Sequence, residues 1–359
     1  LGLDFAFLSN RLQFSGDIYQ RKTTDMFTVG MSLPAVFGTD VPKGNYADLT
    51  TKGFELSVSW RDQFQLASKP FNYEVRFTLA DYQSTIDKYN NPEKKLGDDY
   101  YYEGMKVGEI WGYETEGFFT SQADIDSHAK QPYFYAGATA GQWLPGDIKF
   151  KDLNGDGVID YGNNTVDNPG DQKIIGNSEP RFIYGINLSG DWNNFFVSAF
   201  FQGVGKQDWW PGSEASYFWG MYNRPYNDMP KSHLGNIWTE ENPNTYFPRL
   251  RGYSSEEPYA ELNLKQTRYL QNIAYIRMKN IQLGYTLPKS FISKLRMQNA
   301  KVYVSGENLW SWSPFYKYSK DLDVEAVRGS DRDLTEGTSG NGYSYPILKS
   351  VSFGLSVTF

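Results

Sequence analysis

The chain has 359 residues and no cysteine, which excludes a disulfide framework and thiolate metal sites. Its formal net charge of −7 argues against nucleic acid as a partner, because no basic stripe offsets phosphate repulsion. Aromatic residues make up 17% of the chain, yet no apolar run approaches the roughly 18 residues that a transmembrane helix needs. If this chain is bound in a membrane, strands must cross it.

Alternation of apolar and polar residues recurs along the chain and predicts nine antiparallel strands. The stretch FELSVSWR from Phe54 to Arg61 places large apolar side chains on one face and polar or charged ones on the other. The strands run roughly 9 to 14 residues, as tilted membrane strands require, whereas strands of a soluble sandwich average about 5 or 6. We expect them at residues 1–9, 11–24, 50–62, 70–81, 180–190, 194–204, 272–287, 297–309 and 346–359.

The connections alternate between short and long, as in barrels with tight periplasmic turns and long extracellular loops. The strand-like segment Glu109–Phe119 belongs to the largest loop, because counting it as a spanning strand would break this alternation. Nine strands cannot close around a large lumen. The predicted fold class is therefore all-β, and the chain forms one part of a transmembrane barrel whose other strands come from further polypeptide. The short connections are 9–11, 62–69, 190–193 and 288–296, and the long ones are 25–49, 82–179, 205–271 and 310–345.

The loop at 82–179 contains a calcium-loop-like motif, DLNGDGVID. It offers oxygen ligands at four side chains, a glycine at the sixth position and a backbone carbonyl at the seventh. The twelfth position holds Asn163 instead of a bidentate Glu, so the site needs a further ligand such as Asp147 or Asp167. The alternative is a metal-free turn rich in Asx and Gly. The expected Ca²⁺ ligands are Asp152, Asn154, Asp156, Val158 and Asp160.

Segment 194–202 is apolar on both faces, which predicts that its inner face touches a plug or another packed element. The loop that follows is rich in aromatic rings, which stack on sugars and on peptide side chains. The rings therefore form a candidate surface for substrate or for a lid protein. The alternative is that they pack the loop itself. The residues concerned are Trp209, Trp210, Tyr217, Phe218, Trp219 and Tyr222.

In the predicted strand 272–287, the alternation of apolar and polar residues slips by one position at Lys279 and Asn280. A β-bulge there would keep the apolar side chains on one face of the strand. The neighbouring carboxylates at 321, 323 and 325 lack a nucleophile, a base and an orienting partner, so they are interpreted as loop charges.

The closing strand has apolar residues at alternate positions and ends on an aromatic ring. Aromatic residues near strand ends suit interfacial girdles, namely Trp60, Tyr285, Trp310 and Tyr345.

Six motifs, in order, resemble the SusC/RagA family of TonB-dependent transporters. They are NYADLTTKGFE from Asn45, GDIKFKDLNGDGVID from Gly146, GNSEPRFIYGINLSGDW from Gly176, FFQGVG from Phe200, YIRMKNIQLGYTLP from Tyr275 and VSGENLW from Val304, followed by the closing strand ending in Phe359. The resemblance covers essentially the whole chain. Phe353 and Phe359 then match the C-terminal signal that the barrel-assembly machinery reads in this class.

The resemblance implies nine C-terminal strands of a roughly 22-stranded outer-membrane barrel. It also implies an N-terminal plug, a TonB-contacting segment and a SusD-like lid lipoprotein, with glycans or peptides as cargo. None of the upstream parts is in this sequence, which begins at Leu1 without features of a signal peptide, so we expect a cut chain or a separate subunit.

Two other functions fit parts of the pattern: a secreted calcium-stabilised carbohydrate-binding β protein, and a passive porin. An enzyme is not expected, because the two histidines, His128 and His233, and the available carboxylates form no catalytic constellation.

Overall fold

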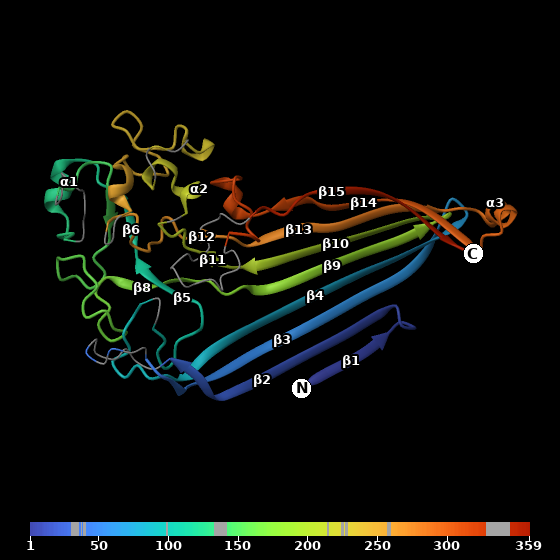
Figure 1. Cartoon of the computed structure of the whole chain (residues 1–359), viewed down its shortest axis with the longest axis horizontal. Coiled ribbons are helices and arrows are strands. Elements are labelled where there is room, and N and C mark those ends of the chain that lie inside the picture. The colour runs from blue at the N-terminus through green and yellow to red at the C-terminus, as the bar shows by residue number, and fades with distance from the viewer. Residues whose placement is uncertain are drawn as a thin grey trace.

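The computed structural model describes residues 1–29, 36, 38, 41–97, 100–132, 142–213, 215–223, 226, 229–256, 260–327 and 345–359. Its main feature is a nine-stranded antiparallel sheet in which each strand pairs with the next spanning strand along the chain (Figure 1). The strands are β1 (Gly2–Phe7), β2 (Leu12–Val29), β3 (Lys43–Leu66), β4 (Lys69–Lys88), β9 (Arg181–Trp192), β10 (Phe195–Lys206), β13 (Tyr275–Thr286), β14 (Asn299–Trp312) and β15 (Ser350–Thr358).

The register of the sheet separates an apolar face from a polar one. One row of paired residues crosses eight strands and is apolar throughout: Phe5, Phe14, Val58, Phe77, Ile186, Phe201, Met278 and Trp310. The neighbouring row, one residue along each strand, is polar or glycine: Asp4, Ser15, Ser57, Thr78, Gly185, Gln202, Arg277 and Ser311. Successive side chains point to opposite faces of a strand, so the two rows lie on opposite faces of the sheet.

The short connections gather at one end of the sheet and the long ones at the other (Figure 1). We call the described residues of 89–180, 207–274 and 313–327 the loop layer. Three small two-stranded sheets lie there: β5 (Glu109–Tyr113) with β8 (Gln172–Asn177), β6 (Thr115–Phe118) with β7 (Ile148–Phe150), and β11 (Asp208–Trp209) with β12 (Gln271–Asn272). Glu109–Phe119 is thus outside the nine-stranded sheet, as predicted.

The helices are short. They comprise α1 (Gln122–Ser127), α2 (Ser216–Trp219) and α3 (Lys289–Ile292), with 3₁₀ turns η3 (Gly220–Tyr222), η4 (Lys231–His233), η5 (Gly252–Ser255), η6 (Ser293–Leu295) and η7 (Pro314–Lys317). Across the described ranges, no helix has the length and apolar character needed to span a membrane.

The hydrophobic core lies in the loop layer and not between two stacked sheets. Its fully buried large side chains include Trp219, Tyr222, Tyr269 and Phe315. The spanning strands instead leave large apolar side chains exposed, among them Phe353 at 86% and Leu355 at 66%. A sandwich would bury this face, so the soluble alternative does not describe the architecture.

The strand count is confirmed, but several predicted boundaries are wrong. β2 continues to Val29 and β3 begins at Lys43, so much of the expected loop 25–49 is strand, and β4 takes the first residues of the expected loop 82–179. The backbone ladder continues there past register shifts at Thr23, Met26 and Asp48, beyond the range over which side-chain alternation is regular. Tyr285 and Trp310 lie near strand ends as expected, whereas Trp60 lies within β3 and Tyr345 outside the strands.

Candidate functional site

Five of the six aromatic residues singled out in the 205–271 loop are buried. Trp209 is 3% exposed and Trp219 is fully buried, with its indole N–H donating to the carbonyls of Pro211 and Gly212 at 3.0 Å. Direct contact with a ligand requires an exposed ring face, which the buried rings do not have, so they pack the loop itself. Tyr217, at 53% exposure, is the member of this set that faces outward. The other buried rings are Trp210, Phe218 and Tyr222.

The calcium-loop-like motif forms a tight turn closed by its own carboxylates. Asp152 accepts hydrogen bonds from the amides of Gly155 and Gly157, at 2.6 and 2.9 Å. Asp156 accepts from the Val158 amide at 2.8 Å, and Asp160 accepts from the Gly162 amide at 2.7 Å. Both glycines have positive φ, as the loop type requires.

The carboxylates of this motif are not neutralised by basic side chains. None of the ion pairs among the described residues involves Asp152, Asp156 or Asp160. Three negative charges therefore lie within nine residues of chain. Within the same described ranges, no group of three or more His, Asp or Glu side chains has the arrangement of a metal site.

Elsewhere in the loop layer, two acidic side chains and an arginine are buried together. Asp147 is fully buried and pairs with Arg251, whose Nε lies 2.7 Å and Nη2 2.5 Å from its two carboxylate oxygens. Glu261, also fully buried, accepts from the Ile148 amide at 2.7 Å. Burial raises the pKa of Glu261 well above its ordinary value, and the negative charge of Asp147 adds to the shift. Asp147 thus serves the packing of the loop layer and is not free to act as a further metal ligand.

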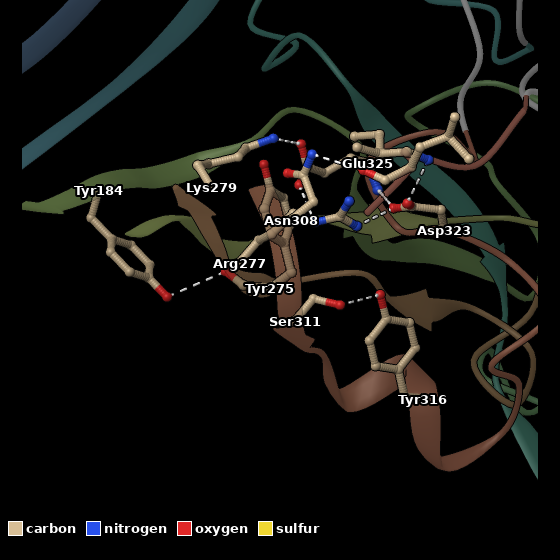
Figure 2. Close-up of polar contacts among 11 residues, drawn as sticks. Tyr184, Tyr275, Arg277, Lys279, Asn308, Ser311, Tyr316, Asp323 and Glu325 are labelled. Atoms are coloured by element: carbon tan, nitrogen blue, oxygen red, sulfur yellow. Dashed lines mark hydrogen bonds and ion pairs between the residues drawn. The ribbon is translucent and has the colours of Figure 1, made fainter. Parts of the chain in front are cut away.

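A second charged cluster joins the loop layer to the sheet (Figure 2). Arg277 and Lys279 project from β13, and Asp323 and Glu325 come from the segment after η7. Arg277 lies 2.5 Å from Asp323 and 2.7 Å from Glu325, and Lys279 lies 2.5 Å from Glu325. The Arg277 side chain is only 4% exposed. We call these four residues the wall latch.

The predicted bulge adjoins the wall latch. Lys279 is skipped in the pairing of β13 with both β10 and β14, which confirms the slip predicted at Lys279 and Asn280. Arg277 and Lys279 are two positions apart and therefore share a face of β13, and the extra residue at the bulge returns Ile281 to the apolar face. On β14 the ladder passes over Asn308, whose φ is +53°. The sequence reading of Asp323 and Glu325 as plain loop charges missed this pairing.

The last strand places its large apolar residues on the apolar face of the sheet. Phe353 pairs with Val304, and Phe359, one residue beyond β15, is 77% exposed. Their side chains are therefore accessible at the edge of the sheet, where a recognition role would require them to be.

The chain is similar to TonB-dependent receptors along its whole length. It is 28% identical to TonB-dependent receptor P3 of Formosa agariphila, of which it covers 33%, and 22% identical to TonB-dependent receptor SusC of Bacteroides thetaiotaomicron, of which it covers 31%. The RagAB peptide transporter superposes with a TM-score of 0.70 at 20% identity, over all of this chain and 34% of that one. The RagAB peptide importer in its open-open state gives a TM-score of 0.67. No family model matches the chain. It spans about a third of the length of these relatives.

Proposed function

We propose that this chain, which belongs to the SusC/RagA family of TonB-dependent receptors, forms part of the wall and the extracellular loops of an outer-membrane nutrient importer. The observation that carries the proposal is the pair of neighbouring rows across the sheet, one apolar and one polar. In a bilayer the apolar row faces lipid and the polar row faces an aqueous lumen. The remaining strands and the plug come from polypeptide beyond these 359 residues.

The loop layer lies on the extracellular side in this proposal. Its aromatic core fixes the loops to one another, and the wall latch fixes them to the barrel. A SusD-like surface lipoprotein closes over this layer after cargo enters, and the exposed Tyr217 is a candidate contact for it. The cargo in this proposal is a glycan or a peptide. Transport draws its energy from the inner membrane through TonB and not from a nucleotide bound to this chain.

We further propose that Ca²⁺ binds the turn at 152–160. The chemistry of the donors supports it, since hard cations prefer the carboxylate and carbonyl oxygens that Asp152, Asn154, Asp156, Val158 and Asp160 provide. The uncompensated charge of the three carboxylates supports it as well. Binding would stabilise the turn by relieving their repulsion.

The exposed Phe359 and Phe353 carry the proposed assembly signal at the end of β15. An apolar edge with an aromatic terminus gives the assembly machinery a strand on which to act. Normal membrane assembly after deletion of Phe359 would argue against this role.

The proposal is tested on the whole transporter, isolated with an affinity tag from outer membranes of its own host. We expect the transporter in the outer-membrane fraction, a co-purified surface lipoprotein, and uptake that stops when TonB is removed. Recovery from the soluble fraction would contradict the barrel assignment. Uptake that persists without TonB would favour a passive porin instead.

A further inference from the structure

A pocket of about 370 Å³ opens in the loop layer, and none of the four wall-latch residues lines it. Three stretches of chain far apart in sequence line it: 96–113, 161–172 and 263–265. Its volume falls in the range of small-ligand sites, roughly 300 to 1,000 Å³. Rings from Tyr100, Tyr102, Trp111 and Tyr161 form much of its lining.

The pocket is held in shape by its own hydrogen bonds. The Trp111 indole N–H donates to the Tyr102 hydroxyl at 3.3 Å, and that hydroxyl donates to Glu109. The other Glu109 oxygen accepts from the Lys106 amide at 3.1 Å. Across the pocket, the Asn164 amide donates to the Leu96 carbonyl at 2.9 Å. A wall fixed in this way loses little entropy when a ligand binds.

Several polar groups in the lining remain available to a ligand. In the part of the chain that the structure describes, no hydrogen bond engages the Tyr100 hydroxyl or the Asn263 side-chain amide, and the Gln172 side-chain carbonyl accepts none. An amide both donates and accepts, as a sugar hydroxyl does. The charged residues of the lining are Glu109 and Lys265, one of each sign, and Glu109 already has two donors.

The strand β5, which contributes to the pocket wall, does not offer a free edge to an extended peptide. One edge of β5 pairs with β8. At the other edge, the Tyr113 amide donates to the Lys265 carbonyl at 2.8 Å, and the Thr267 amide donates to the Tyr113 carbonyl at 3.0 Å. Gly112 permits this approach, since a Cβ there would lie 2.4 Å from the Lys265 carbonyl oxygen. Strand addition, which gives peptides their main-chain hydrogen bonds, is therefore closed along β5.

We infer that this pocket binds a neutral carbohydrate, at a scale of roughly one or two sugar rings. The ring faces of Tyr100, Trp111 and Tyr161 pack against the C–H surfaces of the sugar, whereas Tyr102 is buried and supports the wall. Tyr100, Gln172 and Asn263 bond the sugar hydroxyls. The inference rests on the proposed importer function, because it gives the loop layer a contact with cargo. It also favours glycan over peptide as the cargo at this point of the path.

The test uses the whole purified transporter on an array of defined neutral and acidic oligosaccharides, with hexapeptides in parallel. We expect binding to neutral oligosaccharides, weakened at least tenfold by Tyr100→Ala and by Asn263→Ala. Tyr101→Ala is the matched control: Tyr101 is adjacent and 41% exposed, packs on Tyr89, and is not in the lining, so affinity should stay within twofold. Retained heat-modifiable migration on SDS gels confirms that each variant is folded.

Three results would overturn the inference: no oligosaccharide binding, selective peptide binding, or glycan binding that the pocket variants leave unchanged. The importer proposal survives any of them if the transporter is still in the outer membrane and its uptake still requires TonB. Recovery of the transporter from the soluble fraction would instead overturn the importer proposal.

Discussion

The ring of Tyr303 on β14 occupies the space beside Gly354 on β15, so that a Cβ at Gly354 would lie 2.1 Å from the tyrosine Cζ. The same relationship joins Phe196 to Gly284, at 2.2 Å, on the same polar face of the sheet. Each glycine leaves room for a ring from the adjacent strand, a device that pins register in β-sheets. Phe196, on the apolar inner face of segment 194–202, is accommodated in this way, and contact of that face with a plug or another packed element stays a prediction.

Replacing Gly354 with Val should therefore destabilise the barrel. The added side chain displaces the Tyr303 ring, and overpacking of this kind costs about 1–3 kcal/mol. The temperature at which the whole transporter loses its folded migration on SDS gels should fall. Ser352→Val, on the same face of the same strand, is the control and should have a smaller effect. Equal effects at the two positions would show that the ring and glycine do not form a specific pair.

The wall latch should hold the segment after η7 against the sheet. Removing one partner of a buried ion pair costs about 3–5 kcal/mol, because the other charge is left without compensation. We expect the double variant Asp323→Asn, Glu325→Gln to expose Lys317 and Lys320 to trypsin while the sheet stays folded. Asp321→Asn provides the control, since Asp321 is an exposed carboxylate in the same segment. Unchanged trypsin resistance in the double variant would mean that the latch contributes little.

Period-two alternation was sufficient to predict the nine strands and the bulge at Lys279, because both follow from which face each residue occupies. The ends of β2 and β3 were not predictable in this way, because the strand register shifts at Thr23, Met26 and Asp48 and the alternation is interrupted there. The wall latch pairs residues about 46 positions apart in the chain. The burial of Trp209 and Trp219 likewise depends on loop packing. Such contacts are set by tertiary structure and leave no local pattern in the sequence.

Stability of the loop layer should decrease as pH rises, because of Glu261. Burial raises the pKa of Glu261, so the folded chain retains a proton that the unfolded chain releases at the ordinary carboxyl value. This contribution to stability is complete at a pH below the pKa of Glu261 in the unfolded chain. It is lost as the pH rises to the higher pKa of Glu261 in the folded chain. Glu261→Gln should flatten the decline in unfolding temperature, measured by tryptophan fluorescence from about pH 5 to 9. Glu240 is exposed, so Glu240→Gln is the control and should leave the pH-dependent decline in unfolding temperature unchanged. If the decline persists in Glu261→Gln, another titratable group causes it.

Calcium should raise the unfolding temperature of the loop layer. The double variant Asp152→Asn, Asp156→Asn removes two of the three carboxylates and should abolish the calcium-dependent rise. Glu240→Gln again serves as the control and should retain it. A wild-type unfolding temperature that is the same with EDTA and with millimolar calcium would exclude a functional site in this turn.

The most direct test of the barrel assignment is single-cysteine labelling of neighbouring residues on β15, in a transporter whose cysteines outside this chain have been replaced. This chain contributes none of its own. Phe353 and Ser352 lie on opposite faces of the strand. In outer membranes we expect a water-soluble maleimide to label Ser352→Cys and not Phe353→Cys, and a lipid-soluble reagent to show the reverse preference. Equal labelling of both positions by the water-soluble reagent would contradict a wall with one face in lipid and the other in a channel.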